Sequence, residues 1–199
     1  MTGTSEERWR RLTALLEPFH EQAQVTARRL SRSIEDGNDL YQETLLRAFD
    51  RLPGLRDEAH FRSWFYAILL HRHRSRQRGA FWRRFLPWDE AFPKGAEPSA
   101  GEMGPPGASR EARRAVEALA ALPAEQREAI VLFEVDGFPI EEIARLTGAS
   151  VPAVKSRLTR GRERLRRRYE RLTRASDAGA IGVPLMTPRA PGRTPGERP

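Results

Sequence analysis

The stretch FPIEEIARLTGASVPAVKSRLTRGRERLRRR (residues 138–168) has the pattern of two helices joined by a tight turn. Apolar side chains fall on one face of the first helix, at Ile140, Ile143, Ala144 and Leu146. Gly148 predicts the end of that helix, because glycine readily adopts the left-handed conformation of a C-cap. Ser150 then predicts the N-cap of the second helix, with Pro152 tolerated in its first turn.

The second helix of this stretch is far more basic than the first. Its inward stripe recurs at spacings of four, three and four residues, at Val154, Leu158, Gly161 and Leu165. Basic and hydroxyl side chains fall outside that stripe, at Lys155, Ser156, Thr159, Arg160 and Arg162. This is a helix-turn-helix pattern, whose second helix normally enters a DNA major groove. A helical hairpin with a solvated basic face has the same local pattern, so the stretch alone leaves both interpretations open.

The composition is that of a basic protein with one or two small domains. The chain has 199 residues, of which 39% are hydrophobic and 31% are charged. Its 35 lysines and arginines outnumber 27 aspartates and glutamates, which gives a net charge of +8. Such an excess favours polyanionic partners, above all nucleic acid, although it also serves solubility alone.

Several classes of protein and site are not expected. The sequence lacks cysteine, which excludes disulfides and cysteine-based zinc sites and fits a reducing cytoplasm. The start MTGTSEERWRRL has no apolar core, so it does not predict a signal peptide, and the apolar run 64–70 is too short to span a membrane. His71 and His73 would point to different faces of a helix, so we expect no metal site. Without a phosphate-binding loop or a nucleophile–histidine pair, we expect no cofactor, no small-molecule substrate and no enzymatic activity.

Helices are predicted in the N-terminal half over residues 1–16, 19–34, 39–51 and 59–78. Residues 36–38 (DGN) predict the turn before the third helix, and residues 53–60 predict a loop before the fourth. The fourth helix ends in a basic half, and no acidic residue occurs between Phe61 and Trp88. Such a block repels itself, and a nearby phosphate backbone would relieve that cost.

The C-terminal half begins with a change of composition. Residues 87–109 are rich in proline, glycine and alanine, which predicts a flexible linker. Helical patterns resume at Arg110 and after Pro123, and the basic helix is expected to end near Thr173. The proline-rich tail predicts disorder. Since no stretch alternates as a strand, the predicted fold is all-α, with domains at 1–86 and 110–175, the linker 87–109 and the tail 176–199.

Residues 140–165 (IEEIARLTGASVPAVKSRLTRGRERL) resemble region four of the extracytoplasmic-function (ECF) sigma factors of bacterial RNA polymerase. Residues 39–52 (DLYQETLLRAFDRL) and 61–68 (FRSWFYAI) resemble segments of region two of the same family. The order of the two matches is also that of the family. The resemblance implies an alternative sigma factor that binds core RNA polymerase, selects promoters and helps to melt the minus-ten element.

The resemblance implies promoter-reading roles for residues in both domains. Those matching the positions that read the minus-thirty-five element are Lys155, Ser156, Arg157, Thr159 and Arg160. Those that would capture the minus-ten element as a single strand are Arg56, Phe61, Arg62, Ser63, Trp64, His71, Arg74 and Ser75. Arginine can pair with guanine through two hydrogen bonds, and a flipped base needs a pocket, a stacking surface and nearby cations.

Four of these minus-ten assignments carry an alternative or depart from the family pattern. Core packing is the other role open to aromatic residues such as Phe61 and Trp64. His71 and Ser75 replace an asparagine and an aspartate that are usual in the family. These replacements leave the expected fold intact, but they leave the minus-ten specificity open.

A third implied surface would dock on the largest subunit of RNA polymerase, through Asp39, Gln42, Glu43, Arg47 and Phe49. The implied partners are core RNA polymerase, promoter DNA and an anti-sigma factor. A stand-alone helix-turn-helix repressor or activator is the main alternative, and it would bind duplex DNA tightly without polymerase. A DNA-processing enzyme such as a recombinase would need a catalytic cluster outside residues 138–168.

Overall fold

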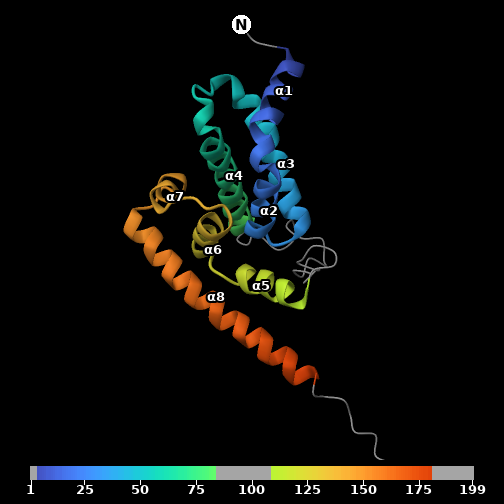
Figure 1. The fold of residues 1–199 in the computed structure, drawn as a ribbon, viewed down its shortest axis with the longest axis vertical. Helices are drawn as coiled ribbons and strands as arrows, with labels where there is room; N and C mark the ends of the chain where they lie inside the picture. The colour runs from blue at the N-terminus through green and yellow to red at the C-terminus, as the bar shows by residue number, and fades with distance from the viewer. Residues whose placement is uncertain (1–3, 84–108, 181–199) are drawn as a thin grey trace, which may run out of the picture.

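Helices make up the regular structure throughout the described residues, which confirms the all-α prediction (Figure 1). The structure is a computed structural model that describes residues 4–83 and 109–180, with the backbone alone at 78–83 and 177–180. The α-helices are α1 (Ser5–Leu16), α2 (His20–Leu30), α3 (Ile34–Arg51), α4 (Phe61–Arg83), α5 (Arg110–Ala120), α6 (Ala124–Ile130), α7 (Ile140–Thr147) and α8 (Val151–Ala180). Shorter helical turns are η1 (Glu17–Phe19), η2 (Leu52–Gly54), η3 (Glu58–His60) and the wider η4 (Val131–Val135).

Helices α1 to α4 form what we call the N-terminal bundle. Its helix ends follow from local sequence: Thr4 caps α1 in a capping box with Glu7, and the Ser33 hydroxyl accepts a hydrogen bond from the Asp36 amide at the start of α3. Side chains that are fully withdrawn from solvent fill its interior, among them Leu12, Leu30, Leu40, Leu52, Phe65 and Leu69. Burial of these side chains supplies the main stabilisation of the bundle.

Gly37 lies inside α3, so the predicted turn at residues 36–38 is wrong. The chain turns earlier, between Leu30 and Ile34, and α3 then passes close to α2. A Cβ atom on Gly37 would lie 2.4 Å from the Cα atom of Arg28. Glycine is therefore needed here because two backbones approach closely, and not because the chain turns.

The Gly37→Ala substitution is expected to destabilise the protein by roughly 1–3 kcal/mol, because α2 and α3 must separate to admit the methyl group. The Gly54→Ala substitution is the matched control, since no atom lies within 4 Å of the position of its added Cβ. Thermal denaturation followed by circular dichroism measures both. An unchanged melting temperature for Gly37→Ala would contradict the close approach of the two helices.

Helices α5 to α8 form the C-terminal bundle, which contains the predicted helix-turn-helix in α7 and α8. Gly148 has a φ of 64° and ends α7, and the Ser150 hydroxyl accepts a hydrogen bond from the Ala153 amide, so both predicted caps are confirmed. Gly161 allows α8 to lie against α6, since its Cβ would be 3.0 Å from Ile130 Cγ1. In Figure 1, α8 runs as one long helix along the outer side of this bundle.

The predicted end of the basic helix near Thr173 is wrong, because α8 continues to Ala180 and includes residues 176–180 of the predicted tail. The helix is longer because arginine and glutamate pairs at helical spacing support its exposed part, including Arg167 with Glu163 at 2.6 Å and Arg174 with Glu170 at 3.6 Å. The predicted linker, apart from Ser109, and the rest of the tail lie outside the described residues.

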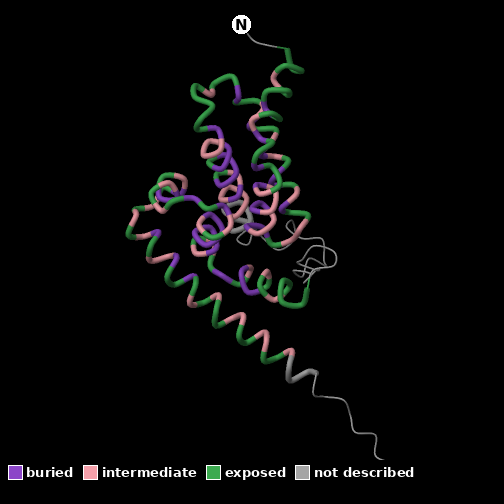
Figure 2. Tube along the Cα trace, in the orientation of Figure 1, coloured by how far each residue is buried: buried purple, intermediate pink, exposed green. Residues whose placement is uncertain are grey.

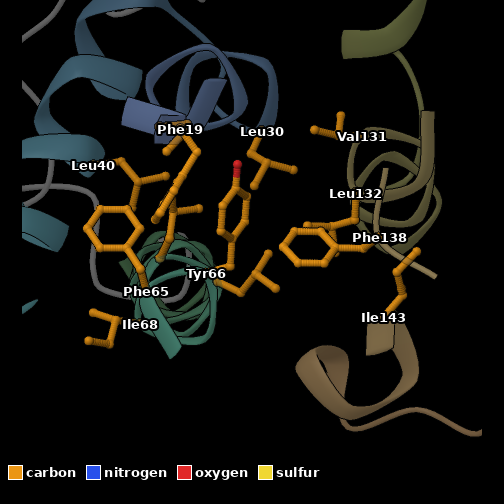
Figure 3. Close-up of a cluster of buried hydrophobic side chains, with 14 of the residues drawn as sticks. Phe19, Leu30, Leu40, Phe65, Tyr66, Ile68, Val131, Leu132, Phe138 and Ile143 are labelled. Atoms are coloured by element: carbon orange, nitrogen blue, oxygen red, sulfur yellow. The ribbon is translucent and has the colours of Figure 1, made fainter. Parts of the chain in front are cut away.

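The two bundles pack directly against each other. Helix α2 contacts α5, α6 and η4, and helix α4 contacts α7. Figure 2 shows the buried segments concentrated around the region where α2, α4 and α6 meet. In Figure 3, Tyr66 lies between apolar side chains of the N-terminal bundle and Phe138 of the C-terminal bundle; the two ring centroids are 4.8 Å apart. The two apolar cores therefore meet at this aromatic contact.

Candidate nucleic-acid and polymerase interfaces

The first turns of α8 present four of the five predicted minus-thirty-five residues toward solvent. Lys155, Thr159 and Arg160 are exposed, and Ser156 is half-buried. The opposite face of the helix is anchored by Val154 and Leu158, which are 0% and 3% exposed. A helix held by its apolar face can offer an ammonium, a hydroxyl and a guanidinium group to base edges and phosphates.

The fifth residue, Arg157, is placed differently. Its guanidinium lies 2.9 Å from the Glu125 carboxylate of α6, and its side chain is 23% exposed. Farther along α8, Arg162 pairs with Glu134 at 2.6 Å and lies over the Phe133 ring. These ion pairs join α8 to α6 and η4, so in this conformation Arg157 is engaged within the C-terminal bundle, unlike the other four predicted residues.

The predicted minus-ten residues fall into distinct environments. Arg56 and His71 are exposed, and Ser75 is half-buried. Phe61 is only 2% exposed and packs against Phe19, so it belongs to the core and cannot stack on a base without unfolding the bundle. Trp64 is half-buried and lines a cleft of about 490 Å³ between the two bundles.

The remaining three minus-ten residues are in contact with the C-terminal bundle. Arg62 donates a hydrogen bond to the Asp136 backbone carbonyl and lies over the Phe138 ring at 4.3 Å. The Ser63 hydroxyl donates to the Glu142 carboxylate. Arg74 is treated below. Three of the eight residues predicted to face DNA are therefore engaged by the protein itself.

Asp136 lies at the centre of this contact and is 4% exposed. Its carboxylate accepts a hydrogen bond from the Tyr66 hydroxyl at 2.7 Å, and the Thr26 hydroxyl lies 2.8 and 2.9 Å from its two oxygens. Burial raises the pKa of Asp136 to about 6, although these hydrogen bonds and the nearby Arg62 and Arg29 favour the charged form. Burial and the Asp136 charge raise the pKa of Tyr66, so its hydroxyl stays protonated as a donor.

Arg74 makes a second polar contact between the bundles. Its guanidinium Nη2 lies 2.6 Å from the Glu128 carboxylate, and its Nη1 donates to the Thr147 carbonyl at 2.8 Å. Glu128 is 3% exposed, so the carboxylate of this ion pair is shielded from solvent. His73 lies beside it, 5% exposed, and burial together with Arg127, Arg74 and Arg76 lowers its pKa to about 4.

The predicted polymerase-binding residues lie on one face of α3. Asp39, Gln42 and Arg47 are exposed, and the neighbouring Leu46 is 58% exposed. Phe49 is half-buried because Trp9 of α1 stacks on its ring at 4.6 Å. The sequence analysis missed this contribution of Trp9, because the pairing of α1 with α3 joins residues that are distant in the chain.

Glu43 is the exception on that face, because it pairs with the basic half of α4. Its carboxylate lies 2.5 Å from Arg72 and 2.6 Å from Arg76. Hydrogen bonds from Arg76 and Arg72 lower the pKa of Glu43 against the opposing effect of burial. The self-repulsion expected for α4 is thus relieved inside the protein, by Glu43 and Glu128, without a phosphate backbone.

Comparison with known proteins identifies the family. The models of sigma-70 region 2 and sigma-70 region 4 match residues 15–83 and 112–165. The ECF RNA polymerase sigma factor SigM of Mycobacterium tuberculosis is 32% identical over 153 residues, which cover 77% of this chain and 74% of SigM. The chain belongs to the ECF sigma factors. The ECF sigma factor EcfG of Rhodopseudomonas palustris is also 32% identical, over 68% of this chain and 72% of EcfG.

Solved structures are also similar to this chain. The sigma factor RpoE from Bartonella quintana, solved in complex with the anti-sigma factor NepR, matches with a TM-score of 0.65 and 25% identity, over 83% of this chain and 98% of that one. CnrH, solved with the cytosolic domain of CnrY, matches with a TM-score of 0.53 at 22% identity and supports the fold alone. Region two of this ECF sigma factor thus lies in the N-terminal bundle, and region four lies in the C-terminal bundle.

Among the helices of residues 4–83 and 109–180, none combines the length and the apolar character needed to cross a membrane. Within the same residues, histidine and acidic side chains do not gather in groups of three or more that could hold a metal ion.

Asp136 and His73 are expected to give opposite pH dependences of stability. The pKa of Asp136 rises from 3.8 to about 6 on folding, so its contribution is present at low pH and is lost as pH rises through 6. The pKa of His73 falls from 6.5 to about 4, so its contribution is present above pH 6.5 and is lost as pH falls toward 4. The two contributions therefore largely cancel between these limits, and each is up to about 3 kcal/mol.

Single variants should separate the two effects. Relative to the parent protein, Asp136→Asn is expected to lose stability on acidification from about pH 7 to about pH 4.5, and His73→Gln is expected to gain it. Urea denaturation across this pH range measures the free energy of unfolding of both variants. Curves that run parallel to that of the parent protein would show that neither group is buried as described.

Proposed function

We propose that this ECF sigma factor binds core RNA polymerase and directs it to a subset of promoters as an alternative sigma factor. The observation that carries the proposal is the exposed basic start of α8, which projects Lys155, Thr159 and Arg160 from a helix-turn-helix linked to a region two in the same chain. The protein supplies binding and positioning, and the polymerase supplies the chemistry. It is therefore a regulatory protein and not an enzyme.

Region four reads the minus-thirty-five element in this proposal. Lys155, Ser156 and Arg160 face the base edges, Thr159 contacts a base or a phosphate, and Arg157 joins them when DNA replaces its Glu125 partner. The outer arginines of α8 contact phosphates, which position the protein without specifying sequence.

Region two captures the single-stranded minus-ten element through Arg62, Ser63 and Arg74 of α4 and through Arg56 in the loop before that helix. Trp64 offers a partly exposed aromatic surface beside them for base stacking. His71 and Ser75 lie farther along the same helix and set the sequence preference.

The exposed face of α3 docks on core RNA polymerase. Asp39, Gln42 and Arg47 supply polar contacts around an apolar centre formed by Leu46 and by the stacked rings of Phe49 and Trp9. An apolar centre with a polar rim is the usual composition of a protein interface. RpoE was solved in complex with the anti-sigma factor NepR, and an anti-sigma factor is likewise a partner in this proposal. The proposed place of action is the cytoplasm, where polymerase and promoters lie.

Run-off transcription tests this function directly. Core RNA polymerase from a related bacterium, supplied with fragmented genomic DNA, is expected to make discrete new transcripts only when the protein is added. Mapping their start sites would give both promoter elements. The absence of new transcripts, together with tight duplex binding in a polymerase-free control, would assign the chain to the stand-alone regulators instead.

Substitutions in α8 test the assignment of the minus-thirty-five surface. Lys155→Ala and Arg160→Ala are each expected to lose roughly 1–3 kcal/mol of discrimination between matched and altered minus-thirty-five elements, because base contacts are removed. Transcription from a panel of promoter variants measures this loss. Arg164→Ala, exposed and farther along α8, should weaken all promoters alike. Loss of polymerase binding in the Lys155 or Arg160 variants would show that this surface has another role.

A further inference from the structure

We propose that the C-terminal bundle is an intramolecular inhibitor of region two, and that Asp136 is the latch that holds it closed. In this closed form the protein engages Arg62, Ser63 and Arg74 of its own minus-ten surface and leaves its polymerase-binding surface open. The inference rests on the proposed function, because the covered surface is the one assigned to the minus-ten strand.

The first argument is the isolation of Asp136 from its own bundle. Every hydrogen bond that the structure gives its carboxylate comes from the N-terminal bundle, namely from Thr26 of α2 and Tyr66 of α4. Its backbone amide meanwhile completes η4 by donating to the Val131 carbonyl. The side chain therefore does not stabilise the turn in which it lies, and its contacts serve the closure of the two bundles.

The second argument is the identity of the covered residues. Arg62, Ser63 and Arg74 are bound to Asp136, Glu142 and Glu128 respectively. A carboxylate is a chemical substitute for a phosphate as a partner of arginine. The C-terminal bundle thus offers anionic and carbonyl oxygens to the same groups that a DNA strand would engage, and the two ligands cannot occupy them together.

The third argument is the polar character of the contact. A buried carboxylate loses hydration, and its hydrogen bonds must offset that loss before the contact is stable. When the bundles separate, Asp136, Glu128 and Arg74 regain water, which lowers the free energy of the open form. Such a contact favours a closed form that can reopen, whereas an entirely apolar contact would favour permanent association.

The fourth argument is the position of the polymerase-binding surface. Asp39, Gln42 and Arg47 on α3 are exposed in the closed form. Core polymerase can therefore bind before the bundles separate, whereas the minus-ten strand can engage Arg62, Ser63 and Arg74 only afterwards. The closed form accordingly prevents the free protein from occupying single-stranded DNA without polymerase.

The absence of cysteine from the sequence allows this closure to be measured on the full chain. Cysteines introduced at Glu35 and Ala121, exposed residues of different bundles, would carry a donor and an acceptor dye. Asp136→Ala leaves the hydroxyls of Tyr66 and Thr26 buried without an acceptor in the closed form, so it should open the protein. Asp50→Ala, at an exposed position of α3, is the matched control.

Asp136→Ala is expected to reduce energy transfer between the dyes and to raise the affinity for a fluorescent single-stranded DNA oligonucleotide of randomised sequence. If about one molecule in ten is open in the parent protein, the apparent dissociation constant should fall about tenfold. Asp50→Ala should change neither quantity. Equal energy transfer in the two variants would overturn the latch, and reduced energy transfer with unchanged DNA affinity would overturn the covering of the DNA surface.

A third variant separates the latch from general loss of stability. In Asp136→Ala, the hydroxyls of Tyr66 and Thr26 have lost their acceptor. Adding Tyr66→Phe and Thr26→Val removes these unpaired hydroxyls, so the bundles should close again and energy transfer should recover. Failure to recover while the helical melting curve stays intact would contradict the specific contact. Because energy transfer needs neither promoter nor polymerase, a silent run-off assay would overturn the proposed sigma activity without altering this result.

Discussion

The burial of the Asp136 carboxylate is the constraint on which the arrangement of the two bundles depends. This residue follows η4 and precedes Gly137, whose φ of 68° turns the chain toward α7. The turn that directs the chain into the helix-turn-helix therefore also places a carboxylate against α2 and α4. A buried carboxylate needs donors, and Tyr66 and Thr26 supply them from helices that are adjacent in the N-terminal bundle. The position of region four relative to region two follows from this requirement.

Basic residues of α4 also pair with acidic residues of the same protein. Its basic half would repel itself in isolation, yet Arg72 and Arg76 share the Glu43 carboxylate, and Arg74 reaches Glu128 in the other bundle. Glu43 lies on the face of α3 assigned to polymerase, and Glu128 lies in region four. The helix assigned to the minus-ten strand is thus connected by ion pairs both to the polymerase surface and to the C-terminal bundle. A net positive charge on the chain does not by itself reveal which cations are available to DNA.

The sequence predicted features whose cause is local and missed those whose cause is distant. The caps at Gly148 and Ser150 and the apolar stripe of α8 follow from a few neighbouring residues, so they could be recognised before the structure. Gly37 lies in a local pattern typical of a turn, but glycine is needed there because the Arg28 backbone of another helix passes close to it. Asp136 likewise precedes a glycine, and no local pattern marks its buried contacts, because its partner Thr26 lies 110 residues away. Local patterns cannot show which surfaces face each other across a linker.

The distinction between local and distant causes also limits which residue roles a family resemblance can assign. The resemblance of residues 61–68 implies a helix that contacts promoter DNA, but the burial of Phe61 and the pairing of Arg62 depend on neighbours outside those residues. In a two-bundle protein, a side chain can satisfy one partner in the free state and another in the complex. The affinity for DNA then equals the affinity of the open form multiplied by the fraction of molecules that are open. Under the proposed closure, Asp136 and Glu128 would change promoter binding through the fraction of open molecules, without touching DNA themselves.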